Sequence, residues 1–190
     1  MGLQRVAVFC GSNVGDSNAY RNAAAALGKA LAADGLSVVF GGTNKGLMEA
    51  LAAGASEAGG TIHGVITRGL ADRGQACRYS TELEVVETRS ERKLRMSELA
   101  DAFVALPGGI GTLEELFEVW VNAQFEGHTK PMGLLNTEGY FAHLMAFIDE
   151  MVKRAFLPAA QRQMVIVESD PHDLIARMRR FEPVTVSKWL

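Results

Sequence analysis

Two glycine-rich segments each follow a short apolar run and precede a segment of helical period. Residues 41–48 read GGTNKGLM after the run VVF, and residues 107–115 read PGGIGTLEE after the run VAL. Glycines allow the backbone to turn with positive φ and to approach a ligand closely, and the N–H groups at a helix start favour an anion. The two segments together predict a phosphate-binding site.

Neither segment matches the better-known phosphate motifs. A dinucleotide fingerprint needs Gly or Ala where the second segment has Glu114, and the first segment lacks the Gly-Lys-Ser/Thr of a P-loop. These differences disfavour a NAD oxidoreductase and an ATPase. Either loop alone is equally well explained as a tight turn, but two such loops after strands of one sheet favour binding.

Charged residues lie beside the second segment. Glu114 and Glu115 both fall in the first helical turn, where acids complement the helix dipole, so helix geometry alone leaves open which carboxylate works on a substrate. The preceding segment, residues 89–101, has four cations among its first seven residues. Its charge pattern alone favours a solvated, salt-bridged helix face, with Glu91 and Arg95 at i and i+4.

Short apolar runs alternate with helical patterns along the whole chain. The predicted strands are residues 5–10, 37–40, 61–66, 83–87, 102–106, 132–135 and 164–167. This alternation predicts an α/β fold, a Rossmann-like doubly wound parallel sheet of about seven strands with helices on both faces, in one domain that spans residues 1–190. In such sheets ligands bind beyond the carboxyl ends of the strands, where both glycine segments begin.

Three further features complete the expected organisation. Capping residues and glycines predict the helix boundaries: Asp16, Ser17 or Asn18 caps the first helix, Gly35 ends it, Gly59 and Gly60 end the second, and Asp170 with Pro171 opens the last. The irregular stretch from Thr67 to Thr81 carries Arg68, Arg73 and Arg78, and is either a solvated surface loop or a functional lid or binding loop. The tail after Phe181 lacks helical period, and its Trp189 indicates a docking contact.

An apolar stripe marks the helix that follows the second glycine segment. Leu113, Leu116, Phe117 and Trp120 lie at i, i+3, i+4 and i+7, so the stripe must pack on the sheet or on a partner. Packing on a second copy of the chain would make a homodimer.

Composition excludes several classes of function. The 190 residues are 48% hydrophobic, enough for one sizeable core, and 19 Lys and Arg against 22 Asp and Glu leave a net charge of −3, which disfavours nucleic acid and anionic membrane surfaces. Two cysteines without a CxxC pair and four scattered histidines predict no metal site. Without a signal peptide or a membrane-spanning run, the expected location is cytoplasmic. Cys10, a small thiol at a buried strand end, is interpreted as packing rather than as a nucleophile.

The PGGIGTLEE segment matches the PGGxGTxxE signature of the Lonely Guy (LOG) family, the cytokinin riboside 5'-monophosphate phosphoribohydrolases. The similarity extends over most of the chain, through the CGS of residues 10–12, the GGxxxGLM of residues 41–48, an ERK with Met96 following, and the run ELADAFVALPGG. The chain departs from the family's usual GGGxxGLMG, from a frequent His at Ser90 and from a frequent Pro at Thr67, and these departures concern the preferred base more than the reaction.

The resemblance implies hydrolysis of the N-glycosidic bond of a purine nucleoside 5'-monophosphate, either AMP or an N6-modified cytokinin nucleotide, to free base and ribose 5-phosphate. It implies no cofactor, and a homodimer with active sites near the subunit interface. The family's catalytic pair falls on Arg92 and Glu115. The substrate-binding residues fall on Ser12, Gly42, Gly46, Met96, Gly108, Gly109, Gly111 and Thr112. Glu115 would stabilise positive charge on the ribose, and Arg92 would position the nucleotide or Glu115.

Three alternatives differ in what they require. A noncatalytic nucleotide or cofactor carrier, like the molybdenum-cofactor carrier proteins that look similar around the glycine loop, would not need Arg92 and Glu115 together. A lysine decarboxylase, a label often given to this family, would need pyridoxal phosphate on a Schiff-base lysine, and no such set is visible. A protein-interaction module built around Trp120 is compatible with enzyme function.

Overall fold

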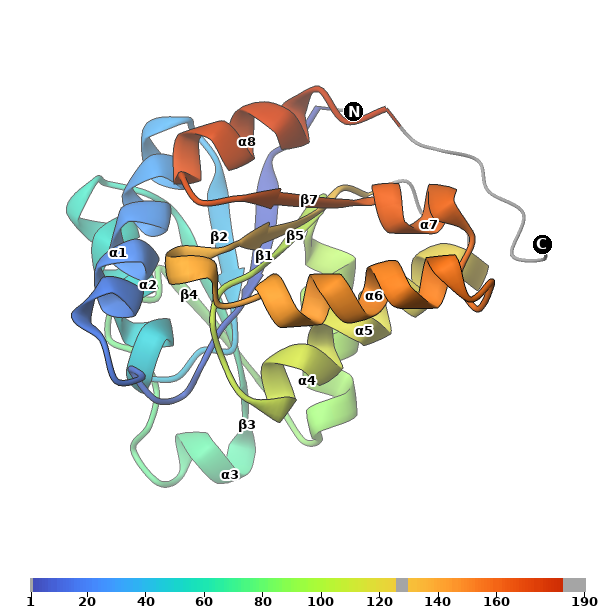
Figure 1. Ribbon diagram of the computed structural model, residues 1–190. Coiled ribbons are helices and arrows are strands. Elements are labelled where there is room, and N and C mark those ends of the chain that lie inside the picture. Colours follow the sequence, from blue (N-terminus) through green and yellow to red (C-terminus); the bar gives the residue numbers. More distant parts are fainter. Residues whose placement is uncertain (1, 126–129, 183–190) are drawn as a thin grey trace.

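A seven-stranded parallel sheet forms the centre of the protein (Figure 1). The computed structural model describes residues 2–125 and 130–182, so the predicted docking of Trp189 lies outside the described residues. The strands are β1 (Arg5–Phe9), β2 (Ser37–Phe40), β3 (Ile62–Thr67), β4 (Glu82–Val86), β5 (Ala102–Ala105), β6 (Met132–Leu135) and β7 (Val165–Glu168). Their order is β4-β3-β2-β1-β5-β6-β7, and every neighbouring pair is parallel. The predicted fold class is confirmed.

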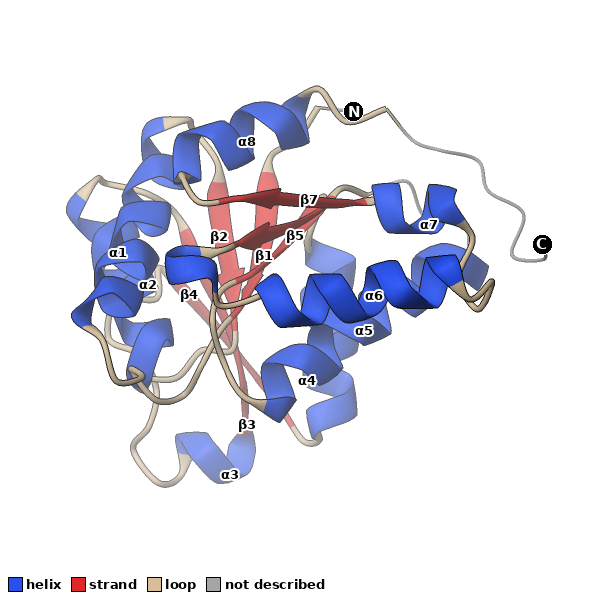
Figure 2. Cartoon of the chain, in the orientation of Figure 1, coloured by secondary structure: helices blue, strands red, loops and turns tan. Residues whose placement is uncertain are grey.

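Helices cover both faces of this sheet (Figure 2). The helices are α1 (Asn18–Ala33), α2 (Gly46–Glu57), α3 (Arg68–Ala71), α4 (Arg89–Leu99), α5 (Ile110–Phe125), a 3-10 turn (Thr137–Gly139), α6 (Ala142–Lys153), α7 (Ala159–Gln163) and α8 (Pro171–Arg179). Side chains of α1, α2 and α8 share one core cluster, and those of α4, α5 and α6 share the other. Along β1, Val6 and Val8 enter the first cluster and Ala7 and Phe9 the second, as the period of two requires. None of the described helices is long and apolar enough to span a bilayer.

The direction of winding changes at β1. From β1 the chain adds β2, β3 and β4 on one side and then returns to add β5, β6 and β7 on the other. The carboxyl ends of β1 and β5 therefore flank the switch point, where doubly wound sheets open a ligand crevice. Both glycine segments lie at this end of the sheet, because they follow β2 and β5.

Most predicted boundaries agree with the structure within one residue. Ser17 caps α1 through its hydroxyl, which accepts from the Ala19 N–H; Gly35, with φ +72°, follows that helix; and Asp170 caps α8. The strand at residues 83–87 differs in character, because β4 is an edge strand whose side chains are largely exposed rather than doubly buried. The stretch from Thr67 to Thr81 is also less irregular than expected, because it begins with the single turn of α3.

The apolar stripe of α5 packs within the protein. Leu116 and Trp120 are buried in the core cluster shared with Phe141 and Ile148, and the Phe117 ring stacks on Trp120 with centroids 6.0 Å apart. The sequence left open whether this stripe packs on the sheet or on a partner, and in the structure it packs on the sheet.

Candidate active site

A pocket of about 400 Å³ opens at the carboxyl ends of β1, β2 and β5. Its volume falls in the range of about 300–1,000 Å³ that is typical of small-molecule sites. Its lining consists of Val8, Phe9, Cys10, Ser12, Gly41, Thr43, Lys45, Met48, Leu70, Gln75, Arg89, Arg92, Met96, Gly109, Ile110, Gly111, Thr112 and Glu115. The pocket is thus located at the switch point between β1 and β5.

Seven of the ten predicted site residues line this pocket. They are Ser12, Arg92, Met96, Gly109, Gly111, Thr112 and Glu115. The other three predicted residues, Gly42, Gly46 and Gly108, do not line it. They come instead from the parts of the two loops that contact neighbouring backbone.

These three glycines permit close packing behind the pocket. Gly42 and Gly46 have φ of +68° and +52°, which L side chains rarely adopt. A Cβ on Gly46 would lie 2.4 Å from the Ser12 carbonyl carbon, and a Cβ on Gly108 would lie 2.1 Å from Thr112 Oγ1. Their positions indicate that they shape the loops and do not touch a ligand in this pocket.

Gly109 and Gly111 are different, because a Cβ on either would meet no atom within 4 Å. Their backbone therefore faces open space, which a ligand can enter. α5 begins between them. The Thr112 and Leu113 N–H groups already donate to the Gly109 carbonyl, at 3.1 and 3.2 Å, whereas the N–H groups before them lie ahead of the helical hydrogen-bond pattern. The start of α5 is suited to an anion by its exposed donors and by the helix dipole.

The Arg92 and Glu115 side chains meet inside the pocket. Arg92 Nη2 donates to Glu115 Oε1 across 2.5 Å, and the two side chains are only 13% and 9% exposed. Arg92 extends from α4 over the backbone of Gly41, where a Cβ would lie 3.2 Å from Nη1. Gly41 therefore belongs to the site, because its lack of a side chain lets the Arg92 guanidinium lie close to the backbone. The only sequence feature that pointed to this residue was the glycine pair at the end of β2.

Two opposing effects act on the Glu115 carboxyl. Burial raises its pKa, because a charged carboxylate is poorly solvated there, whereas the charge and the hydrogen bond of Arg92 lower it. Burial is the larger effect, so the pKa of Glu115 lies above the ordinary glutamate value. Glu115 thus becomes a carboxylate at higher pH than an exposed glutamate does.

Glu114 does not line this pocket and is held by cations. Its carboxylate contacts the Lys93 Nζ and lies 3.6 Å from Arg89 Nη2, and Lys93 also contacts Glu118 at 2.9 Å. Of the two glutamates that the helix pattern leaves equivalent, Glu115 is the one that lines the pocket.

The predicted i, i+4 pairing of Glu91 with Arg95 is wrong. Glu91 closes a capping box at the start of α4, where its carboxylate accepts from the Thr88 N–H and its own N–H donates to Thr88 Oγ1. Arg95 instead donates to Glu84 and Glu98. The cap fixes the first turn of α4 and hence the position of Arg92 within it.

Cys10 lines the pocket but has the properties of a packing residue. Burial, and next the negative charge of Glu115, raise the pKa of its thiol far above the ordinary cysteine value. A neutral thiol is a poor nucleophile, which agrees with its interpretation as packing.

Sequence patterns missed most of the remaining lining. Lys45 was visible as a charge within the first glycine segment, and Arg89 as one of the four cations at the start of residues 89–101. Leu70 and Gln75 come from the stretch between β3 and β4, whose contacts no local pattern encodes. The three arginines of that stretch do not line the pocket. Arg68 pairs with Glu87 at 2.7 Å, and Arg78 donates to the Tyr79 hydroxyl.

Known proteins resemble this chain over most of its length. The model of a family described as "Possible lysine decarboxylase" matches residues 48–178. A probable cytokinin riboside 5'-monophosphate phosphoribohydrolase of Oryza sativa subsp. japonica is 41% identical over 96% of this chain and 80% of its own length. A cytokinin riboside 5'-monophosphate phosphoribohydrolase of Arabidopsis thaliana is 40% identical over the same shares.

Among solved structures, the molybdenum cofactor binding protein of Rippkaea orientalis superposes with a TM-score of 0.73 at 22% identity, over 95% of this chain and 98% of that one. The molybdenum cofactor carrier protein of Chlamydomonas reinhardtii gives the same TM-score at 23% identity, over 94% and 98%. At such identities the likeness extends to the fold alone. The family match and the identity to the plant proteins go further: this chain belongs to the LOG family of cytokinin riboside 5'-monophosphate phosphoribohydrolases.

Proposed function

We propose that this protein hydrolyses the N-glycosidic bond of a purine nucleoside 5'-monophosphate, AMP or an N6-modified cytokinin nucleotide. The products are the free base and ribose 5-phosphate. The observation that carries the proposal is the buried pair of Arg92 and Glu115, which shares one pocket with the open glycine start of α5. The activities named for the plant relatives support the same reaction.

The proposed binding mode follows from the pocket's donors. The 5'-phosphate binds at the first turn of α5, against the N–H groups around Gly109 and Gly111 and the Thr112 side chain. The ribose then lies beside Glu115, one helical turn further along α5. In this arrangement the ribose lies against the Glu115 carboxylate. The 5'-phosphate, which takes no part in breaking the glycosidic bond, holds the nucleotide in place.

Glu115 and Arg92 have different roles in this mechanism. The C1'–N9 bond breaks with its electron pair on the base, and water supplies a hydroxyl to C1' and a proton to the base. Positive charge develops on the ribose as the bond breaks, and the Glu115 carboxylate stabilises that charge and orients the attacking water. Arg92 holds Glu115 in place through its hydrogen bond, and its guanidinium charge favours the ionised form of that carboxyl.

A noncatalytic carrier is the second candidate, because the molybdenum-cofactor proteins share the fold. A carrier requires a pocket and an anion site but does not require a buried carboxylate at the sugar. Lysine decarboxylation has less support. Lys45 is the one lysine among the lining residues described above, and it is exposed, whereas a Schiff-base lysine needs a site that encloses the cofactor.

The 5'-phosphate is expected to be essential. Purified protein should release free base from AMP or N6-isopentenyl-AMP at least about 10²-fold faster, in kcat/KM, than from the matching nucleoside, because the nucleoside lacks the anion that α5 binds. Free base is measured by chromatography over a panel of nucleoside monophosphates and nucleosides. Equal turnover of AMP and adenosine would contradict the phosphate assignment.

We further propose that the protein is at least a homodimer. Leu94 on α4, Ile110 on α5 and Phe147 on α6 are 61%, 83% and 60% exposed, and these helices cover the same face of the sheet. Ile110 also lines the pocket, so a partner that covered these side chains would reach the mouth of the site.

Sedimentation should therefore give the mass of a dimer or a larger oligomer at micromolar concentration. Leu94→Asp, which lies outside the pocket lining, should shift the distribution toward monomer and reduce turnover, because a charge would be buried at the interface. Asp149→Ala, an exposed change on α6 that removes an ion pair with Arg162, is the matched control. A wild-type monomer that is independent of concentration and fully active would rule the dimer out.

A further inference from the structure

The stretch between β3 and β4 forms one end of the pocket. We name residues 67–81 the β3–β4 segment; it contains α3, which projects beyond β3 at the bottom of Figure 1. The sheet order places the ends of β5, β1 and β2 side by side, with β3 next to β2. The pocket crosses these ends, from the start of α5 at β5 to Leu70 and Gln75 of the β3–β4 segment.

This order places the three parts of a nucleotide, if the proposed function holds. The phosphate lies at the start of α5, and the ribose lies beside Glu115 and Arg92. The base is attached to the opposite side of the ribose, so it extends away from β5, toward the ends of β2 and β3. The residues that it reaches there belong to the first glycine loop and to the β3–β4 segment.

Backbone hydrogen bonds fix the β3–β4 segment to the first glycine loop. The Asn44 N–H donates to the Gln75 carbonyl and the Cys77 N–H donates to the Gly42 carbonyl, both at 2.9 Å, around an antiparallel bridge of Thr43 with Ala76. The Gln75 N–H in turn donates to the Leu70 carbonyl at 3.1 Å. Gln75 is thus held at both of its backbone polar groups, which fixes its position in the lining of the pocket.

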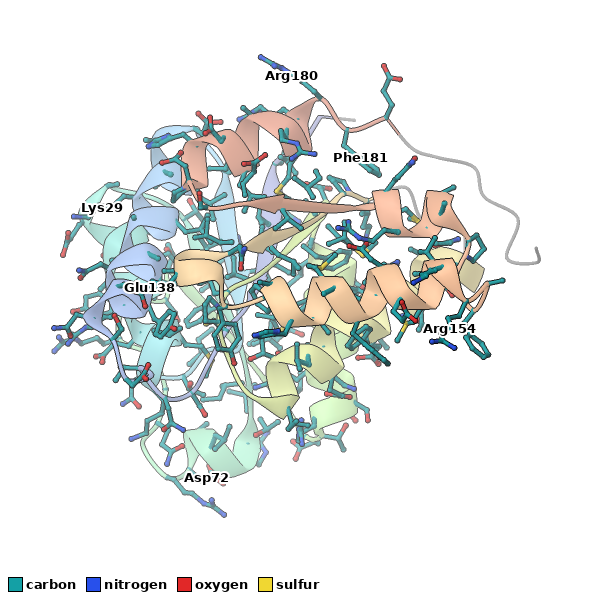
Figure 3. The ribbon with its side chains drawn as sticks, viewed as in Figure 1. Lys29, Asp72, Glu138, Arg154, Arg180 and Phe181 are labelled. Carbon is teal, nitrogen blue, oxygen red and sulfur yellow. The ribbon has the colours of Figure 1, made fainter. Side chains whose placement is uncertain are left out.

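The two side chains offer complementary contacts. Leu70 is half-buried and, with Met48, gives this end of the pocket an apolar surface. Within the part of the chain that the structure describes, no hydrogen bond engages the Gln75 side-chain amide, which has both donors and an acceptor. Arg68, Asp72 and Arg73 of the segment are exposed, and Asp72, at the end of α3, lies at the outer edge of the molecule in Figure 3, whereas Cys77 is buried in the core.

We propose that the β3–β4 segment determines base specificity, with Leu70 contacting a hydrocarbon substituent on the exocyclic N6 and Gln75 hydrogen-bonding to the edge of the purine ring. This inference rests on the proposed function for the orientation of the nucleotide. An apolar side chain makes a favourable contact with an alkyl group on N6 but not with an unmodified amino group. Leu70 therefore changes the ratio of the affinities for the N6-substituted nucleotide and for AMP. An amide pairs with the ring of either nucleotide, so Gln75 changes both affinities together.

The test measures binding in the Glu115→Gln background, where nucleotides survive a titration. Dissociation constants are determined for N6-isopentenyl-AMP, AMP and ribose 5-phosphate, the last of which lacks a base. Leu70→Ala should reduce the preference for N6-isopentenyl-AMP over AMP about 10-fold, the low end of what a lost apolar contact costs in a specificity pocket. Gln75→Ala should weaken both nucleotides about equally. Ribose 5-phosphate should bind unchanged in both variants, which shows that the fold and the phosphate site are intact.

Arg73→Ala is the matched control, because Arg73 is exposed in the same segment and does not line the pocket. It should change none of the three constants. A preference that Leu70→Ala leaves unaltered, or a loss of ribose 5-phosphate affinity as large as that of the nucleotides, would overturn the inference. Failure of the proposed function gives a different signature: wild-type protein would release no base from any nucleotide, whatever the affinity ratios in the variants.

Discussion

Glu115→Gln should fold normally, bind nucleotide and lose most of its turnover, with kcat lower by about 10²-fold or more, equivalent to roughly 3 kcal/mol. The substitution keeps the shape of the side chain and removes its charge. An amide cannot stabilise positive charge on the ribose, and it cannot accept a proton from water. Steady-state kinetics with AMP and N6-isopentenyl-AMP measure kcat, and ribose 5-phosphate binding and thermal unfolding check the fold.

Glu114→Gln is the control for this prediction. The structure begins α5 at Ile110, so both glutamates lie in its second turn rather than in the first turn expected from the sequence, and an effect through the helix dipole would be small and similar for each. Glu114 is held by Lys93 outside the pocket, and its replacement should leave kcat within about 2-fold of wild type, as expected for the loss of a partly exposed ion pair. Near wild-type turnover by Glu115→Gln, or equal damage by Glu114→Gln, would show that the carboxylate has been assigned incorrectly.

Arg92→Ala should also be nearly inactive, although for another reason. Removing the guanidinium leaves Glu115 buried without the charge and the hydrogen bond that lower its pKa. The pKa of Glu115 should rise further, and the carboxyl should be neutral over more of the pH range in which wild-type enzyme is active. The acid limb of the kcat/KM profile should therefore move to higher pH in this variant.

The double variant tests whether the pair acts as one unit. If Arg92 works through Glu115, then Arg92→Ala combined with Glu115→Gln should be little worse than either single change. Arg95→Ala on the same helix is the control, because Arg95 pairs with Glu84 and Glu98 away from the pocket, and it should retain near wild-type kcat. Additive losses in the double variant would mean that Arg92 contributes separately, for example by contacting the nucleotide directly.

The fold was largely predictable because its determinants are local. Buried parallel strands are continuous apolar runs, and residues such as Ser17, Gly35 and Asp170 mark helix ends through their own side chains or φ angles. The same holds for the start of α5, where glycines and a following helix predict a candidate anion site without reference to the rest of the chain.

Contacts between distant segments were not predictable in this way. Helix period leaves Glu114 and Glu115 equivalent, and only the packing of α4 against α5 brings Arg92 to one and Lys93 to the other. The i, i+4 spacing of charges also cannot decide between competing partners of one side chain. For this reason the spacing predicted an ion pair of Glu91 with Arg95, whereas Glu91 caps α4. Gln75 reaches the pocket through backbone bonds to the first glycine loop, for which its own sequence gives no signal.

The central claim is cleavage of a nucleotide at its glycosidic bond, and product analysis of AMP hydrolysis tests it most directly. Wild-type protein and Glu115→Gln are incubated with AMP, adenine is quantified by chromatography, and phosphorus species are followed by ³¹P NMR. The account predicts equal amounts of adenine and ribose 5-phosphate from wild type, no inorganic phosphate, and a rate lower by about 10²-fold or more for Glu115→Gln. Adenosine with inorganic phosphate as products, or unchanged AMP with wild-type protein across the nucleotide panel, would contradict it.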